Sequence, residues 1–279
     1  MDAVETGATI GSLLRESGLP RAEAELLLRS LLGRERVYLI AHAEAAIDSR
    51  QARTAQDWFA RRRAGEPIAY ITGRREFYGV ALRVTPDVLI PRPETELLVE
   101  LALERIPQAS AARVLELGTG SGAVAVALAK ERPGLKIIAT DISEAALAVA
   151  RRNAREHGAA IDFVRSDWFE TLGLERFDLI VSNPPYVAAG DSHLERGDVR
   201  FEPRLALVGG EDGLACLRII AAHARRWLRP GGWLLLEHGY DQKEPCVELL
   251  REFGYIDVEG FEDLAGVPRV CSGHRSGPF

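Results

Sequence analysis

The chain has 279 residues, of which 47% are hydrophobic and 27% are charged, and its formal net charge is −6 at pH 7. These values are typical of a globular protein with one large domain, or with a small domain joined to a larger one. No apolar stretch approaches the roughly 20 residues of a membrane span, and residues 1–5 lack a basic flank before an apolar core. We therefore expect a cytoplasmic protein that does not contact a membrane.

Charge divides unevenly along the sequence. Residues 1–85 carry 13 arginines, no lysine and 11 acidic residues, a net charge of +2, which leaves 22 basic and 30 acidic residues, a net charge of −8, for the remainder. Phosphate contacts supply much of the affinity for duplex DNA, so the acidic part disfavours that substrate. It suits a basic partner better.

The three cysteines, Cys216, Cys246 and Cys271, are scattered through the last third of the chain. They show no metal-ligand spacing. We expect free, buried thiols in a reducing compartment, and no metal site.

Residues 1–65 indicate a small helical domain. Apolar residues recur there at helical spacing, namely Leu13, Leu14, Ala24, Leu27, Leu28, Leu31 and Leu32. Asp48 or Ser49 can cap a further helix that runs through Trp58. The basic run at residues 61–63 is interpreted as the solvated end of that helix, with a nucleic-acid patch as the alternative.

Residues 66–93 change in character and predict a hairpin and a linker. Segments 76–80 and 81–84 have the pattern of two paired strands. Residues 88–96, Val-Leu-Ile-Pro-Arg-Pro-Glu-Thr-Glu, then lead into a helix with Leu97, Leu98 and Leu101. The prolines stiffen this linker.

Residues 94–279 alternate strand and helix patterns. The expected strands are 113–117, 136–140, 161–164, 178–182, 233–238, 255–260 and 267–272, and the expected helices are 122–131, 143–157, 212–228 and 241–253. This alternation predicts an α/β fold with a doubly wound, mostly parallel, seven-stranded Rossmann-like sheet. The last two strands have no helix between them, so we expect one antiparallel strand at the end of the sheet.

A glycine-rich turn follows the first of these strands and is the expected cofactor loop. It consists of Gly118, Thr119, Gly120, Ser121 and Gly122, and a helix begins directly after it. Glycines allow the backbone to approach a ligand closely, and a helix N-terminus offers free N–H groups. The loop also fits the looser dinucleotide fingerprint, so the motif alone leaves a nicotinamide cofactor open.

Three further features favour S-adenosylmethionine. Gly122 completes a Gly-x-Gly-x-Gly pattern preceded by Glu116, whose carboxylate suits a cationic ligand and would repel a pyrophosphate. Asp141 ends the next strand, where a carboxylate fits a ribose diol. Asp167 can accept the adenine amino group, and the ring of Trp168 can cover the base, although core packing also explains this tryptophan.

Asn183-Pro184-Pro185-Tyr186 directly follows the strand at 178–182. The two prolines fix two φ angles and remove two N–H donors, so the loop presents the Asn183 side-chain oxygen and the Pro184 carbonyl as acceptors. Tyr186 adds an aromatic face. This arrangement can hold a planar –NH2 group. The alternative is a purely structural role, in which the turn merely ends a strand. Because ligands of open α/β sheets bind at the carboxyl ends of the strands, all these motifs are expected in one crevice.

With these motifs the chain resembles the PrmC/HemK-type protein-glutamine methyltransferases, within the class I S-adenosylmethionine-dependent methyltransferases. The likeness extends over nearly the whole chain, and it also includes the segments 76–79, 89–96, 201–203, 209–213 and 235–240. It implies transfer of a methyl group to N5 of the glutamine in the Gly-Gly-Gln motif of peptide chain release factors 1 and 2, with S-adenosylhomocysteine as product. It also implies that residues 1–65 dock the substrate, and that the enzyme is a monomer without direct nucleic-acid contact.

The resemblance also assigns roles within the site. Residues 118–122, Asp141, Asp167, Trp168 and Asn183 would line the cofactor. The loop from Asn183 to Tyr186 would hold the glutamine, and Asn183, Pro184 and Tyr186 would be its catalytic members. Glu94 and His238 lie in segments that border the cleft, but their roles stay open.

The sequence leaves two alternative functions. Asn-Pro-Pro-Tyr is shared with adenine-N6 nucleic-acid methyltransferases, so it specifies the chemistry and not the substrate. A non-catalytic, cofactor-binding scaffold is the second alternative, which the intact glycine loop and Asn183 disfavour.

Overall fold

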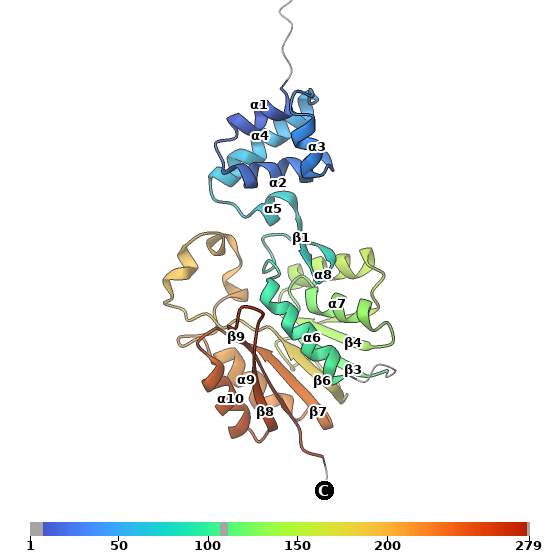
Figure 1. Ribbon diagram of the computed structural model, residues 1–279. Coiled ribbons are helices and arrows are strands. Elements are labelled where there is room, and N and C mark those ends of the chain that lie inside the picture. Colours follow the sequence, from blue (N-terminus) through green and yellow to red (C-terminus); the bar gives the residue numbers. More distant parts are fainter. Residues whose placement is uncertain (1–7, 107–110, 278–279) are drawn as a thin grey trace, which may run out of the picture. The chain divides into compact units, whose positions relative to one another are not determined.

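We describe the protein from a computed structural model, which describes residues 8–106 and 111–277. These residues form two compact units (Figure 1). The first comprises residues 8–74 together with 197–201, and the second comprises residues 75–196 and 202–277 without the gap at 107–110. The boundaries differ from the expected division at 65 and 93.

The first unit is helical. Its elements are α1 (Ile10–Glu16), α2 (Arg21–Leu32), α3 (Arg36–Ala41), α4 (Ser49–Arg63), α5 (Ile68–Thr72) and the short 3-10 turn η3 (Val199–Phe201). Leu27, Leu28 and Phe59 are among the buried side chains that hold the helices together. Asp48 caps α4 and accepts hydrogen bonds from the backbone N–H groups of Arg50 and Gln51, which confirms one of the two expected caps.

The arginine run ends α4 as expected and Arg63 is exposed, but each of the three side chains also has an internal partner. Arg61 pairs with Glu66, and Arg62 pairs with both Glu23 and Asp198. Arg63 donates to the backbone carbonyl of Ser17. These internal partners take up part of the hydrogen-bonding capacity of the run, so its arginines are less available to a nucleic acid than their sequence indicates.

The expected hairpin is present, but it is part of the second unit rather than a free linker. Its strands β1 (Arg74–Phe77) and β2 (Val80–Arg83) flank a two-residue turn in which Tyr78 and Gly79 both have positive φ. Such turns suit tight hairpins. Phe77 is buried in the main core of the second unit, as are Val80 and Leu82 on β2.

A seven-stranded sheet dominates the second unit. Its strands are β3 (Arg113–Leu117), β4 (Lys136–Asp141), β5 (Ile161–Arg165), β6 (Phe177–Ser182), β7 (Leu228–Glu237), β8 (Ile256–Glu262) and β9 (Pro268–His274). Their order across the sheet is β5-β4-β3-β6-β7-β9-β8, in which the first five strands are parallel. β9 runs antiparallel to both of its neighbours. The doubly wound fold is confirmed, but the antiparallel strand is the penultimate one and not the edge strand.

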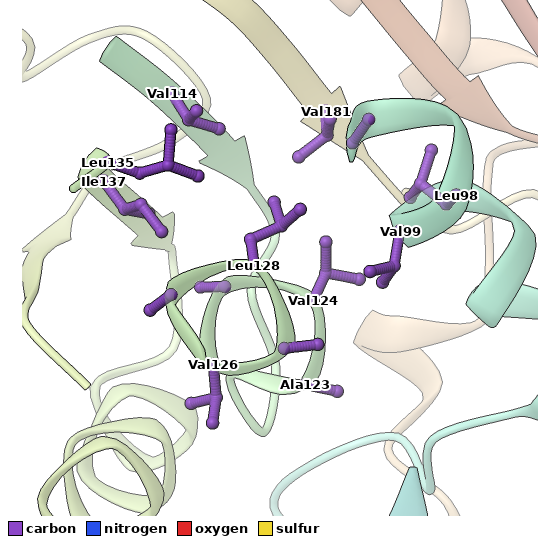
Figure 2. Close-up of a cluster of buried hydrophobic side chains, with 14 of the residues drawn as sticks. Leu98, Val99, Val114, Ala123, Val124, Val126, Leu128, Leu135, Ile137 and Val181 are labelled. Atoms are coloured by element: carbon purple, nitrogen blue, oxygen red, sulfur yellow. The ribbon is translucent and has the colours of Figure 1, made fainter. Parts of the chain in front are cut away.

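Helices cover both faces of this sheet (Figure 1). One face carries α6 (Glu96–Arg105), α7 (Ala123–Glu131) and α8 (Glu144–Glu156), and the other carries α9 (Ala215–Ala224) and α10 (Lys243–Glu252). Side chains alternate between the two cores, so Val114 of β3 packs under α7 whereas Leu115 packs toward α9. Figure 2 shows the first of these cores, where the alanine-rich α7 lies against Val114 and Val181.

Sequence periodicity located these elements well but misplaced some of their ends. The helix expected over 212–228 ends at Ala224, and β7 already begins at Leu228, five residues before the expected start. Two short 3-10 turns, η2 (Ser192–Glu195) and η4 (Arg204–Ala206), lie in a region for which no regular structure was predicted.

Two of the three cysteines are joined, contrary to the expectation of free thiols. A disulfide links Cys246 of α10 to Cys271 of β9, and both residues are buried in the core between that helix and the sheet. Cys216 is free and half-buried.

No helix within residues 8–106 and 111–277 is long and apolar enough to cross a membrane.

A buried asparagine fastens the hairpin to the glycine loop. Asn153 of α8 is fully buried; its Oδ1 accepts from the backbone N–H of Arg83 at 2.8 Å. Its Nδ2 donates to the carbonyls of Arg83 and Ser121 at 3.0 and 2.8 Å. One side chain therefore satisfies three backbone groups of two distant segments.

We expect Asn153→Ala to lower the free energy of unfolding by about 3 kcal/mol or more, because each buried polar group left without a partner costs roughly 1–3 kcal/mol. Arg83→Ala is the matched control. It keeps the backbone bonds to Asn153 and removes only a partly exposed ion pair with Glu156, worth about 1 kcal/mol or less. Denaturant unfolding of both variants measures the difference, and equal losses would contradict the role given to Asn153.

Candidate active site

One cavity of about 380 Å³ opens at the carboxyl ends of the parallel strands in the second unit. It brings together most of the predicted site residues, namely Gly118, Thr119, Gly120, Ser121, Asp141, Asp167, Trp168, Asn183 and Pro185. Gly122, Pro184 and Tyr186 are not part of its wall. The cavity is also lined by residues that the sequence analysis did not assign to the site, among them Asp87, Val88, Thr95, Leu205 and Cys216.

The glycine loop has two kinds of glycine. Gly118 and Gly120 have φ values of +71° and +54°, and a Cβ atom at either position would meet almost nothing. Their need for glycine is therefore conformational, and they leave space beside the cavity. Gly122 also has positive φ, but a Cβ there would lie 3.1 Å from the Cβ of Ala150. It is a packing glycine between α7 and α8.

Asp141 faces the glycine loop. Its Oδ2 accepts from the backbone N–H of Gly120 and its Oδ1 from that of Ser143, both at 2.9 Å. Burial raises the pKa of this carboxyl, while the backbone hydrogen bonds oppose the rise. Each oxygen of a carboxylate has two acceptor positions, so both oxygens can accept one further hydrogen bond. That capacity suits a pair of ribose hydroxyls.

Glu116 lies deeper in the same wall and is 4% exposed. The hydroxyl of Thr119 donates to its Oε2 at 2.6 Å. Burial raises the pKa of Glu116 to about 8, and the nearby Asp141 adds to the rise. A cation bound in the cavity would favour the ionised form of this carboxyl.

Asp167 and Trp168 both line the cavity, after the end of β5. Trp168 has a φ of 47°, which is uncommon for a residue other than glycine. Its neighbour Phe169 is buried and stacks on Trp227. Trp168 lines the cavity and also packs against the core between the sheet and α9, so core packing still explains part of this tryptophan.

The loop after β6 contributes Asn183 to the cavity wall. The Nδ2 of Asn183 donates to the Oγ1 of Thr95 at 3.0 Å. The side chain of Tyr186 points elsewhere, because its ring packs against the core and its hydroxyl donates to Oε1 of Glu237 at 3.3 Å. Burial and the charge of Glu237 raise the pKa of this hydroxyl far above its usual range. The geometry therefore gives Tyr186 a supporting place and not the expected open stacking face.

Residues 207–215 wrap the outside of this loop. The backbone N–H of Val187 donates to Leu207 O, and that of Gly209 donates to Val187 O, both at 2.9 Å. A Cβ atom at Gly209 would lie 2.4 Å from Pro185 O, and one at Gly213 would lie 2.3 Å from the carbonyl oxygen of Tyr186. Glycine is required here for close approach, and the contact holds the Asn-Pro-Pro-Tyr backbone in place.

A buried ion pair ties the segment before α6 to the same region. Arg92 donates to Glu202 Oε1 at 2.5 Å, and the backbone N–H of Ile90 donates to Oε2 at 3.2 Å. Glu202 is 4% exposed, whereas Arg92 reaches the cavity wall. These bonds fix the two segments that bring Val88 and Leu205 to the cavity.

The two residues left open by the sequence occupy supporting places. His238 is fully buried directly after β7, where its Nδ1 bonds to the carbonyl of Gly239 at 2.8 Å. Burial lowers the pKa of His238. Glu94 lies 3.9 Å from Arg269 of β9. Neither residue lines the cavity.

Sequence reasoning missed Thr95, Glu202 and Glu237 as partners of the site. Thr95 and Glu237 are 5% and 1% exposed. The signals in the sequence were the polar ends of the Ile-Pro-Arg-Pro-Glu-Thr segment and of the apolar strand 233–238, but nothing in the sequence paired them. Among the described residues, no group of three or more His, Cys, Asp or Glu side chains is placed to hold a metal ion.

We expect Asp141→Ala to weaken S-adenosylmethionine binding by about 2–4 kcal/mol, because it removes two hydrogen bonds to a charged group. Asp162→Ala is the control, since Asp162 is exposed on the neighbouring β5 and lies outside the cavity wall. Calorimetry of both variants gives the affinities, and a thermal melt without ligand checks that residues 118–122 still fold. Equal affinities for the two variants would remove Asp141 from the cofactor site.

Comparisons with known proteins agree with this geometry. Residues 8–73 match the PrmC N-terminal domain, and residues 94–198 match the methyltransferase small domain. The chain is 50% identical to the release factor glutamine methyltransferase of Bordetella pertussis, over 94% of this chain and 97% of that protein. It is also 50% identical to the protein of the same name from Burkholderia pseudomallei, over 97% of each.

Among solved structures, a methyltransferase from Pyrococcus furiosus is similar in fold, with a TM-score of 0.55 and 22% identity over 78% of this chain and 98% of that one. At such low identity the likeness concerns the fold alone. The two relatives at 50% identity span nearly the whole chain, so it belongs to the family of release factor glutamine methyltransferases.

Proposed function

We propose that the chain transfers a methyl group from S-adenosylmethionine to N5 of the glutamine in the Gly-Gly-Gln motif of peptide chain release factors. The observation that carries the proposal is the side-chain amide of Asn183, whose Nδ2 is held by Thr95 while the residue borders the cavity. Its Oδ1 is thereby left as an acceptor for a substrate –NH2 group. The names of the relatives supply the class of substrate.

The cavity suits S-adenosylmethionine in charge and in shape. Asp141 offers two acceptor oxygens for ribose hydroxyls beside the open side of Gly118 and Gly120. The buried carboxyl of Glu116 favours a cationic ligand, and Trp168 offers an aromatic face. When bound, S-adenosylmethionine supplies an electrophilic methyl group on a sulfonium sulfur.

The task of the protein is to hold a poor nucleophile. The lone pair of an amide nitrogen is delocalised into its carbonyl group, so the side chain must be aligned and polarised before it reacts. The Oδ1 of Asn183, on the cavity wall, would accept one amide hydrogen, and the backbone carbonyl of Pro184, whose side chain lies outside that wall, would accept the other; both would favour the positive charge that develops on nitrogen. Preorganised dipoles of this kind are worth about 3–4 kcal/mol, and alignment at contact distance adds an entropic gain.

The reaction needs no general base on the protein, because an N-alkylated amide cation is strongly acidic and loses its proton to water. The ionisable groups around the site therefore serve binding and orientation. Tyr186 supports this machinery through Glu237.

The acidic residues just beyond Tyr186, Asp191, Glu195 and Asp198, belong to the acidic part of the chain that suits a basic partner, but they are largely paired within the protein. Asp191 pairs with His193, Glu195 with Arg204, and Asp198 with Arg62. Because Glu195 and Asp198 each have an arginine partner, local neutralisation reduces the field that steers a release factor. Recognition must then rely more on shape and on the acceptor loop.

The other assignments for the chain stay proposals. We propose that residues 1–65 dock the protein substrate, that the enzyme acts as a monomer without direct nucleic-acid contact, and that it works in the cytoplasm, where release factors act. An adenine-N6 nucleic-acid methyltransferase would require a basic cleft. The arginines at 61–63, the densest basic run of the first unit, are instead paired internally.

We expect Asn183→Ala to reduce kcat by about 10²-fold or more, the cost of one lost preorganised polar partner. Cofactor affinity should remain measurable, because residues 118–122 and Asp141 are unchanged. Mass spectrometry of a release factor incubated with S-adenosylmethionine measures the turnover, and calorimetry measures the binding. A kcat close to that of the unaltered enzyme would refute the role of Asn183.

The substrate should be selected by its amide hydrogens. We expect a release factor with Gly-Gly-Glu to be rejected by about 10⁴-fold or more, because a carboxylate has no hydrogens for a site built of acceptors. Gly-Gly-Asn should react very slowly, since its amide is one methylene short of the methyl donor. Parallel assays on the three release factors and on duplex DNA test this. Robust methylation of the Gly-Gly-Glu protein, or of DNA in preference to the Gly-Gly-Gln protein, would overturn the proposed function.

A further inference from the structure

Three side chains behind Asn183 come from separate parts of the second unit. Thr95 is the last residue of the 3-10 turn η1 (Pro93–Thr95) and directly precedes α6, Glu237 ends β7, and Tyr186 belongs to the loop after β6. Thr95 and Glu237 are 5% and 1% exposed. Buried polar groups are costly unless they are hydrogen-bonded, so the meeting of these side chains calls for an explanation.

The contacts form a chain that leads from the cavity wall to a carboxyl group. Asn183 Nδ2 lies 3.0 Å from Thr95 Oγ1, and Tyr186 OH lies 3.3 Å from Glu237 Oε1. The Thr95 hydroxyl is also near enough to Glu237 to lower the pKa of that carboxyl by hydrogen bonding. Within the described residues, Glu237 Oε2 is buried and makes no hydrogen bond, so it is an unused acceptor toward which the Thr95 hydroxyl can turn its proton.

The chemistry of these groups gives the chain a direction. An ionised carboxylate only accepts, so Tyr186 must donate to Glu237, and any hydrogen bond between Thr95 and Glu237 must be donated by the Thr95 hydroxyl. The oxygen of Thr95 is then the acceptor toward Asn183, and Asn183 must present its NH2 group to it. The amide is thereby locked with Oδ1 on its other side, since the two ends of an asparagine amide are chemically opposite but nearly equal in shape.

We propose that Thr95 and Glu237 are positioning residues that orient the Asn183 amide, so that Oδ1 and not Nδ2 faces the substrate. The inference rests on the proposed function of Asn183 as an acceptor for the glutamine amide. Reversal of these hydrogen bonds would turn the NH2 group of Asn183 toward the substrate NH2 group and remove the acceptor. Tyr186 supports the orientation because its hydroxyl also donates to Glu237.

The charge of Glu237 sets the pH range of this orientation. Burial raises the pKa of Glu237 to about 7, and Glu94 of η1 raises it further, whereas Arg269 of β9 and the hydroxyls of Thr95 and Tyr186 lower it. Above this pKa the Glu237 carboxylate can only accept hydrogen bonds, so the hydrogen bonds from Glu237 through Thr95 to Asn183 have one direction. Below it the protonated acid can donate to Thr95, which then can donate to Asn183, so kcat should fall as the pH drops through about 7.

Substitutions that keep the shape test the orientation. Thr95→Val keeps the volume and removes the hydroxyl, and Thr95→Ser restores the hydroxyl. Glu237→Gln keeps the shape and can donate through its own NH2 group. We expect Thr95→Val and Glu237→Gln to lower kcat by about 10-fold to 10²-fold, up to the size of one lost oriented dipole. Thr95→Ser should keep most of kcat, and S-adenosylmethionine affinity should change little in all three.

Ser272→Ala is the matched control, because Ser272 is a fully buried hydroxyl on the neighbouring β9 and makes no hydrogen bond to the chain behind Asn183. In Glu237→Gln the acid limb of the kcat profile should disappear. In Tyr186→Phe it should move to higher pH, because the lost hydrogen bond lowered the pKa of Glu237. Substitution of a residue that merely packs, as in Ser272→Ala, would leave the acid limb of the kcat profile unchanged.

A second readout does not depend on turnover. The chain has only two asparagines, Asn153 and Asn183, so labelling with [15N]asparagine gives two side-chain NH2 signals in an NMR spectrum. The chemical shift of the Asn183 signal should change with pH around 7 in the unaltered protein, and it should not change with pH in Glu237→Gln. The Asn153 signal is the internal control, since its partners are backbone groups.

The two readouts separate the possible failures. If the unaltered enzyme does not methylate a Gly-Gly-Gln protein, the proposed function fails, and the NMR titration alone then decides whether the amide is oriented. Unchanged kcat in Thr95→Val and Glu237→Gln would overturn the positioning role, as would equal loss in Thr95→Val and Thr95→Ser. An Asn183 signal that ignores Glu237 would also overturn it, even in a fully active enzyme.

Discussion

The site depends on the parallel register of three strands. Leu117, Thr140 and Ser182 are direct neighbours across β4, β3 and β6, and each is followed within one residue by a group that faces the cavity. The next residues are Gly118, Asp141 and Asn183. A shift of one strand by a single residue would turn its core side chains to the opposite face, so the core that fixes the register also fixes the site.

Secondary bonds then secure the loops that leave this register. The backbone N–H of Thr119 donates to the carbonyl of Thr140, and Ser182 Oγ donates to the carbonyl of Leu117, both at 2.8 Å. These bonds connect the starts of the glycine loop and of the Asn-Pro-Pro-Tyr loop to the neighbouring strands. Methyl transfer requires two ligands to meet in line, and short, tied loops on a rigid sheet provide that alignment.

The amino-acid sequence predicted the parts of this arrangement that local pattern encodes. The strand ends, the glycine loop and Asp141 follow from apolar runs and the residues that interrupt them. The sequence did not predict the disulfide between Cys246 and Cys271, the internal partners of Arg62 or the antiparallel β9 between β7 and β8. Each of these joins residues whose sequence separation carries no periodic signal, so only the packed structure pairs them.

The same limit explains why the polar groups behind Asn183 escaped sequence analysis. Thr95 directly precedes a helix and Glu237 ends an apolar strand. Either position alone accounts for a polar residue there, so neither residue suggests a site. Yet Glu116 and Glu237 are both fully enclosed carboxyls whose burial raises their pKa, to about 8 and about 7. Buried ionisable groups of this kind reduce stability unless they are paired. For Glu237 this cost is intelligible, because a charge there chooses the direction of the hydrogen bonds behind Asn183, and an asparagine amide can face its substrate in either of two opposite senses.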